Sequence, residues 1–154
     1  NQIAVMEART MWLKGHHPLL LVQHVEHGSV LQQMMPEAEF LHGKHKQKER
    51  SAVLKDFSAG LAKSLIATTI FDEAIDIPAC DGTIMVGGGA SYVRTIQRMS
   101  RSMRLDRDNP KKDKCYIIDF WDVDKDIERH SKVRMTTYMS EKAFKIVQKH
   151  ELPY

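Results

Sequence analysis

The chain has 154 residues, 42% of them hydrophobic, which suits one globular domain with a core of its own and is too short for two. Its net charge is only +3, so its basic character is local: residues 94–114 hold five Arg and three Lys against three Asp. That segment favours an anionic partner.

No apolar run approaches the roughly 18 residues that a membrane-spanning helix requires, and no signal-peptide pattern opens the chain. Cys80 and Cys115 lie in or beside apolar segments, which indicates small core residues rather than a disulfide framework. We therefore expect a soluble, intracellular (cytoplasmic) domain without a membrane partner. Because the chain starts at Asn1 with a helical pattern, we also expect it to be a fragment of a longer protein.

The first half of the chain alternates between helical and strand patterns. Residues 2–14 have helical spacing, with Ile3, Met6, Thr10 and Leu13 on one side, and Gly15 is a suitable stop. The apolar run 19–22 predicts a buried parallel strand. A short helix from Gly28 to Met35, a strand over 39–41 and a helix over 46–57 ending at Gly60 follow, the last of them burying Val53, Leu54 and Phe57.

The second half continues the alternation. Apolar runs predict strands over 64–68, 83–86 and 115–120, and a last helix is expected over 124–148. Strands separated by helices imply right-handed crossovers, so we expect an α/β fold whose parallel sheet carries helices on both faces. Ligands of such sheets bind at the carboxyl ends of the strands. The loops at Gln23, His42-Gly43, Thr68-Thr69 and Gly87-Gly88-Gly89 should therefore share one edge.

The helix expected after the glycine run carries two distinct faces. Over Gln97–Arg104, Met99 and Met103 fall on an apolar stripe and a row of arginines on the opposite side. The choice of arginine over lysine suits bidentate recognition of phosphate. The alternative interpretation of the row is a solvated basic face.

Four segments in order resemble the C-terminal, RecA-like motor domain of superfamily-two helicases. Leu19–Gln23 is similar to the opening of the family's fourth motif, and Gln47–Arg50 to its Gln-x-x-Arg element. Residues 67–78 resemble the fifth motif, and Gln97–Arg104 the sixth, Gln-Arg-x-Gly-Arg-x-x-Arg. The glycine run, together with His130-Ser131-x-x-Arg134 and Tyr138 in the last helix, resembles the bacterial and phage DNA-repair branch.

The resemblance implies a nucleotide site shared with a partner domain. Arg101 and Arg104 would act as arginine fingers on the γ-phosphate of ATP. Asp76 would accept a hydrogen bond from the ribose, and Gln97 would lie beside the phosphates. Ala74 replaces the usual glycine of the fifth motif, and Ser100 replaces the glycine of the sixth. Either side chain would narrow the space through which the nucleotide approaches the backbone.

The resemblance also implies contacts to nucleic acid, with DNA preferred by family branch and RNA as the alternative. Thr68 would bind a phosphate through its hydroxyl and backbone N–H, and Arg50 the strand's backbone. Gly43 would permit close approach, and Gln47 belongs to the same element. Such contacts hold a strand without reading its sequence. Lys44, Lys46 and Lys48 either add to this positive groove or form a solvated helix start.

The sequence lacks a phosphate-binding loop of the Gly-x-x-x-x-Gly-Lys-Ser/Thr type and an acidic magnesium motif. The domain alone is therefore expected to be inactive, with ATP and Mg²⁺ held mainly by an N-terminal domain that this chain lacks. The alternative, motivated by Ala74 and Ser100, is a non-catalytic nucleic-acid-binding or adaptor module that kept the fold.

Two further patterns suggest other sites. The pairs His24/His27 and His42/His45 have spacings found at zinc sites, but no cysteine joins them, so we expect solvated loop histidines and no metal. The methionines at 34, 35, 99 and 103 suit a partner groove, although methionine at helical spacing is more often core filling.

Overall fold

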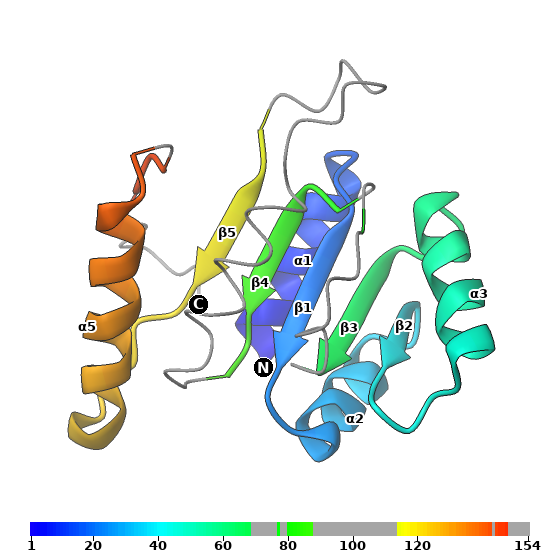
Figure 1. Cartoon of the computed structure of the whole chain (residues 1–154), viewed down its shortest axis with the longest axis horizontal. Helices are drawn as coiled ribbons and strands as arrows, with labels where there is room; N and C mark the ends of the chain where they lie inside the picture. The colour runs from blue at the N-terminus through cyan, green and yellow to red at the C-terminus, as the bar shows by residue number, and fades with distance from the viewer. Residues whose placement is uncertain (69–76, 78–79, 88–113, 143, 148–154) are drawn as a thin grey trace.

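The computed structural model of the chain describes residues 1–68, 77, 80–87, 114–142 and 144–147. These residues form a five-stranded sheet in the order β2-β3-β1-β4-β5. Every neighbouring pair is parallel, and the five arrows in Figure 1 point the same way. The strands are β1 (Pro18–Val22), β2 (Ala38–Leu41), β3 (Ser64–Thr68), β4 (Gly82–Met85) and β5 (Tyr116–Asp119).

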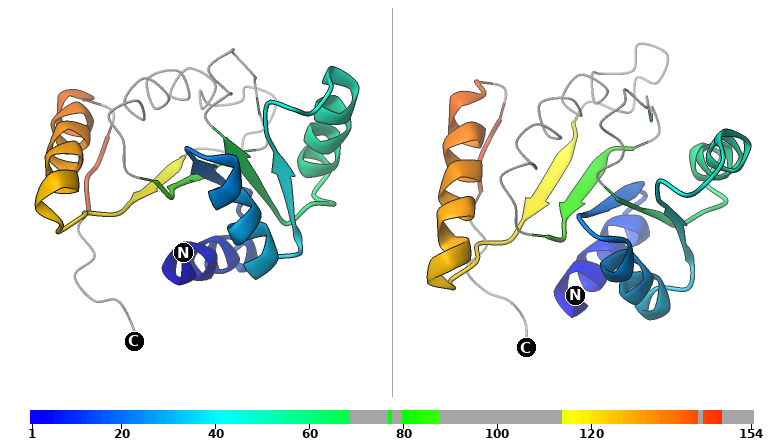
Figure 2. Two further views of the ribbon diagram at one scale, coloured as in Figure 1. Left: turned by 90° about the horizontal axis from the view of Figure 1, so that it is seen from below. Right: turned by 60° about the horizontal axis from the view of Figure 1, so that its bottom comes forward.

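Helices cover both faces of the sheet, as expected for an α/β domain. One buried cluster joins α1 and α2 to the sheet, and a second joins α3 and α5 to the opposite face. Figure 2 shows the two pairs on opposite sides. The helices of the described part are α1 (Gln2–Leu13), α2 (Val25–Met34), α3 (Gln47–Ser58) and α5 (Lys125–Ser140).

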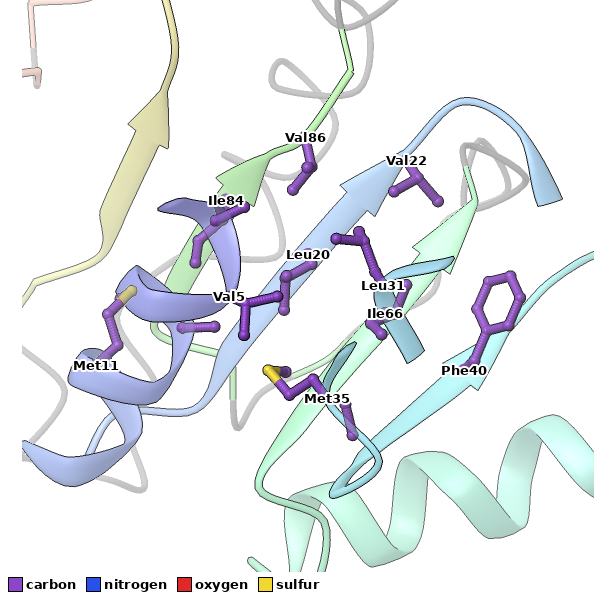
Figure 3. Close-up of a cluster of buried hydrophobic side chains, with 13 residues drawn as sticks. Val5, Met11, Leu20, Val22, Leu31, Met35, Phe40, Ile66, Ile84 and Val86 are labelled. Carbon is purple, nitrogen blue, oxygen red and sulfur yellow. The ribbon is translucent and has the colours of Figure 1, made fainter. Parts of the chain in front are cut away.

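The central strands explain why the sequence shows continuous apolar runs. All five residues of β1 and of β3 are buried. Because side chains alternate along a strand, Leu20 and Ile66 enter the first cluster, whereas Leu19, Leu21 and Leu65 enter the second. Figure 3 shows the first cluster between α1, α2 and the sheet. A strand buried on both faces has no polar side to alternate with.

The buried face of α1 differs from the one that the sequence predicted. Ala4, Val5, Ala8 and Met11 are buried, whereas Met6 is 38% and Leu13 76% exposed. Two alanines allow the helix backbone to approach the sheet closely, and this small-residue face carries less hydrophobicity than the stripe of larger side chains. Packing distance therefore selected a different face from the one that side-chain size indicated.

The second helix starts at Val25, three residues before the predicted start at Gly28. The sequence pattern predicts Gly28 as the first residue of the helix, whereas Gly28 lies inside α2 against the ring of Phe40 on β2. A Cβ at position 28 would collide with that ring. The glycine therefore serves close helix-to-sheet packing, which outweighs its cost of roughly 1 kcal/mol in a helix.

Predicted helix ends are confirmed after α1 and α3 but not after α5. Gly15 and Gly60 have φ of 86° and 72°, the left-handed conformation that ends helices. Phe57 of α3 is fully buried, and Val53 and Leu54 are partly buried. Helix α5 stops at Ser140 rather than at residue 148. After it, Phe144 packs back on the second cluster, 6.2 Å from the Tyr138 ring between centroids.

The amino edge of the sheet is tied together through Asp81. Its carboxylate contacts His16 Nδ1 at 2.8 Å and accepts the His17 backbone N–H at 2.6 Å. Cys80, next to it, is buried as predicted, whereas Cys115 is only partly buried. In the part of the chain that the structure describes, no helix is long and apolar enough to cross a bilayer.

Candidate functional site

The carboxyl edge of the sheet gathers the predicted loops. Because all strands are parallel, the loops that follow β1, β2, β3 and β4 begin at the same edge, as expected. Strand β1 continues into α2 on one face, whereas the segment after β3 returns through Ile77 and Cys80, which belong to the cluster of the other face. The connections after the neighbouring strands β1 and β3 thus run on opposite faces of the sheet. Open α/β sheets bind ligands at such a reversal of the crossover direction.

Thr68 is the last residue of β3 and lies at this reversal, in register with Val22 of β1. It is 2% exposed, and its Oγ1 has no hydrogen-bond partner among the described residues. A buried hydroxyl without a partner costs about 1 to 3 kcal/mol. The Thr68 hydroxyl is therefore a polar group whose hydrogen-bonding capacity the described residues do not satisfy.

The loop between β2 and α3 is held by Arg50. Its guanidinium donates from Nε to the His45 carbonyl at 3.1 Å and from Nη2 to the Gly43 carbonyl at 3.1 Å. Glu49 accepts the backbone N–H of Lys46 at 2.8 Å, which satisfies one of the unpaired donors of the first turn of α3. Arg50 is thus a brace for the loop, a role that the sequence interpretation had not assigned to it.

The outer side of this loop is positively charged. Lys44, Lys46 and Lys48 are exposed, as are Gly43 and Gln47, whereas Arg50 is half-buried. Glu49, the acidic side chain nearest in sequence, is engaged at the start of α3. The exposed ammonium groups therefore face solvent beside the carboxyl edge, where they favour an anionic ligand.

Among the histidines of this region, His42 and His45 interact with each other, whereas His27 contacts Asn1. The rings of His42 and His45 lie 4.1 Å apart between centroids, and His27 Nε2 contacts Asn1 Oδ1 at 2.6 Å. Within the described ranges, no three His, Cys, Asp or Glu side chains are grouped as a metal ion would require. Burial, then the neighbouring His45 and Lys44, lowers the pKa of His42.

We expect the domain to lose stability on mild acidification. Burial lowers the pKa of His27, with the charges of the N-terminus and His24 adding to it, as burial lowers that of His42. The unfolded chain then binds more protons than the folded chain below about pH 6.5, so stability falls as pH falls through the lowered pKa values. Urea unfolding at pH 7.5 and 5.5 measures this, and the His27→Gln/His42→Gln double variant should reduce the difference. An equal pH dependence in that variant would contradict the assignment.

A buried polar network joins the end of β5 to α5. Arg134, 1% exposed, donates from Nε to Asp119 Oδ2 at 2.7 Å and from Nη2 to the Phe120 carbonyl at 3.0 Å. Its Nη2 also contacts Asp122 at 3.4 Å and Ser131 Oγ at 3.1 Å. The network therefore fixes the backbone that leaves β5 at the carboxyl edge.

Tyr138 completes this network by donating to Asp119 Oδ2 at 2.7 Å. Burial raises the pKa of Tyr138 well above its usual range, and the Asp119 carboxylate adds to the effect. Although burial lowers the pKa of Arg134, the hydrogen bond and charge of Asp119, together with Asp122 and Tyr138, raise that pKa above its usual value. Sequence interpretation singled out Ser131, Arg134 and Tyr138 but missed Asp119, whose signal was a carboxylate closing an apolar strand.

The nucleotide-binding candidates lie outside the described residues. These are the arginine fingers and the residues of the fifth and sixth motifs, namely Ala74, Asp76, Gln97, Arg101 and Arg104. Their roles therefore stay predictions. Of the predicted nucleic-acid residues, Gly43, Gln47 and Arg50 lie together at the β2–α3 loop, and Thr68 follows from the neighbouring strand β3.

Sheet order, crossovers and the loops at the carboxyl edge define a RecA-like α/β domain. Residues 7–106 match the family model described as the helicase conserved C-terminal domain, and this chain belongs to that family. A putative helicase 22 from a Sulfolobus islandicus filamentous virus is 30% identical over 105 residues, 66% of this chain and 18% of the viral protein. The DNA 3'-5' translocase XPB2 of Sulfurisphaera tokodaii is 34% identical over 70 residues, 46% of this chain and 15% of the relative.

A solved structure supports the same fold. Dbp5 L327V of S. cerevisiae, bound to RNA and ADP BeF3, superposes with a TM-score of 0.64 at 21% identity. The match covers 89% of this chain and 35% of that one. The chain thus spans less than a fifth of the two curated relatives and about a third of this solved chain.

Proposed function

We propose that this chain is the second motor domain of an ATP-dependent superfamily-two helicase or translocase, preceded in a longer protein by an ATP-binding domain. The observation that carries the proposal is the family match over residues 7–106 on a sheet whose carboxyl edge gathers Gln23, Gly43, Thr68 and Gly87. The relatives named as helicase and DNA translocase support movement along nucleic acid, and a relative named as an ATP-dependent RNA helicase supports ATP as the energy source.

The proposed nucleotide half of the site consists of groups that complete a pocket on the partner domain. Arg101 and Arg104 neutralise charge on the γ-phosphate in the transition state. Asp76 binds the ribose, and Gln97 with Ala74 lines the approach to the phosphates. ATP with Mg²⁺ is held mainly by the partner domain, and the ADP BeF3 bound to the similar Dbp5 supports an adenine nucleotide as the ligand.

The proposed nucleic-acid half is the positive loop after β2 together with Thr68. Arg50 holds the carbonyls of Gly43 and His45, so the loop is preformed before a strand arrives. Gln47 opens the same helix and is exposed. Thr68 is covered in the isolated domain, so its contact with a phosphate requires that closure on the strand uncovers the hydroxyl.

We propose DNA as the strand, of the kind used in bacterial or phage DNA repair. The name of the Sulfurisphaera translocase and the glycine run support DNA, whereas the RNA in the Dbp5 structure supports the alternative. Contacts of the proposed kind go to phosphate and sugar, so discrimination between the two rests on the 2′-hydroxyl. Titrating single-stranded DNA and RNA of the same sequence at several salt concentrations decides between them.

We expect Arg50→Ala to weaken binding of single-stranded nucleic acid and to reduce its salt slope by about one unit. The matched control is Lys55→Ala, which removes a positive charge from an exposed position on the same helix. Arg50→Lys keeps the charge without the fork that braces the loop, so it separates phosphate contact from loop support. Fluorescence anisotropy of a labelled oligonucleotide measures both quantities. Equal slopes for the Arg50 and Lys55 variants would contradict the groove.

The adaptor alternative is tested more directly. Reading the coding sequence upstream of Asn1 shows whether a phosphate-binding loop precedes this domain. A complete upstream sequence without that loop favours a non-catalytic module and contradicts the motor proposal. If the loop is present, nucleic-acid-stimulated ATP hydrolysis by the longer protein is the expected activity.

A further inference from the structure

Trp121 stands out because it is presented to solvent at the same edge as the proposed site. It is 48% exposed and lies two residues after the end of β5, next to Asp122. In the sheet order, β5 and β2 occupy opposite ends, so Trp121 and the Gly43 loop bracket the carboxyl edge. Four strand spacings separate these ends, roughly 19 Å.

The backbone on each side of Trp121 is fixed to α5. The carbonyl of Phe120 accepts a hydrogen bond from Arg134 at 3.0 Å, and the N–H of Asp122 donates to Ser131 Oγ at 3.1 Å. Arg134, which holds this turn, is itself almost fully buried. The exposed indole therefore lies on a turn whose backbone is already fixed. Binding of a ligand to the ring then requires little loss of backbone conformational entropy.

The surroundings select the chemistry of the ligand. Asp122 and Asp124 flank the turn in sequence and outnumber the exposed Lys125 that follows them, and the buried Arg134 is already engaged by carboxylates, so the turn favours a phosphate less than the lysine-rich loop does. An indole face needs no charge in its partner, because stacking on a base is driven by surface burial and π contact. The exposed apolar area of one indole, Val123 and Ile127 is small compared with the roughly 800 Å² per partner that a stable protein interface buries.

We infer that Trp121 is a stacking platform for a nucleobase. This inference rests on the proposed function and deepens it by adding a base contact at the end of the edge away from the positive loop. The base comes either from the bound strand or from the adenine of ATP. A strand held by phosphates at Arg50 and by a base at Trp121 would be gripped at both ends without sequence readout.

The test uses Trp12→Phe, which leaves Trp121 as the tryptophan reporter of the chain. Trp12 lies on α1 beneath Lys63, 4.4 Å from the ammonium, in another part of the domain. We expect a single-stranded oligonucleotide to quench Trp121 fluorescence and an abasic strand of equal length to leave it unchanged. ATP titrated separately distinguishes adenine from strand as the source of the base.

Binding of a labelled oligonucleotide is measured in parallel by anisotropy. Trp121→Ala should weaken binding by roughly 5- to 100-fold, Trp121→Phe should retain most of it, and the control Val123→Ala should change it little. If the strand binds Trp121→Ala as tightly as the unaltered chain, and neither the strand nor ATP quenches Trp121 fluorescence, the stacking inference is overturned and the proposed function stands. Absence of strand binding by the unaltered chain contradicts the proposed nucleic-acid groove as well as the inference. Quenching that appears only on adding the preceding protein domain assigns the indole to a protein contact and overturns the inference.

Discussion

Replacing Arg134 by methionine is expected to lower the free energy of unfolding by about 3 to 5 kcal/mol. The guanidinium is 2% exposed and contacts the carboxylates of Asp119 and Asp122 at 2.7 and 3.4 Å. Methionine has a similar volume but leaves the partly buried Asp119 carboxylate, 17% exposed, with only the Tyr138 hydroxyl as a described side-chain partner. The loss therefore arises from an uncompensated charge rather than from a cavity.

Urea unfolding of the isolated chain measures this change. The matched control is Arg129→Met, because Arg129 is exposed on the same helix and its replacement should alter stability by less than about 0.5 kcal/mol. Adding Asp119→Asn to Arg134→Met should recover part of the loss, since it removes the unpaired charge. Similar stability losses in the Arg129 and Arg134 variants would show that the network does not stabilise the fold.

Arg101→Ala and Arg104→Ala are each expected to slow stimulated ATP hydrolysis by about 10³- to 10⁵-fold in the longer protein. The physical reason is that a guanidinium aimed at the γ-phosphate stabilises charge that develops only in the transition state. Nucleotide affinity should change far less than turnover, because the proposed phosphate loop belongs to the preceding domain.

The control for the fingers comes from the same predicted helix. Arg94→Ala removes an arginine of the same basic face that the motif does not assign to the nucleotide. The rate of ATP hydrolysis by this variant should therefore stay within about tenfold of the rate of the unaltered protein. Arg104→Lys keeps the charge but not the bidentate fork, and should remain strongly impaired. Unchanged turnover in both alanine variants would remove the finger assignment while leaving the fold unaffected.

Much of the architecture could be predicted because its signals are local. The runs at 19–22 and 64–68 predicted two central strands, since strands buried on both faces read as continuous apolar residues. Gly15 and Gly60 marked helix ends because they adopt positive φ. The alternation of strands and helices also predicts that the loops after β1 to β4 lie at one edge of the sheet.

Other features depended on partners distant in the chain. The inner face of α1 follows alanines that fit a close approach to the sheet, and Gly28 sits in a helix because the Phe40 ring lies against it. A helical wheel shows which residues share a face, but it does not show how closely that face approaches the sheet or the Phe40 ring. Arg50 illustrates the same limit at the site, since a motif indicated a strand contact but only the folded loop showed its bonds to Gly43 and His45.

The strands, their parallel arrangement and the motif order typical of helicase C-terminal domains can be predicted from the amino-acid sequence, because they depend on local propensity and spacing. Which side chains brace the carboxyl edge depends instead on how distant segments pack. Arg134 meets Asp119 and the carbonyl of Phe120 because α5 packs back beside β5, and that contact leaves Trp121 exposed on a fixed turn. Buried ion pairs and exposed rings are products of packing, which no single segment encodes.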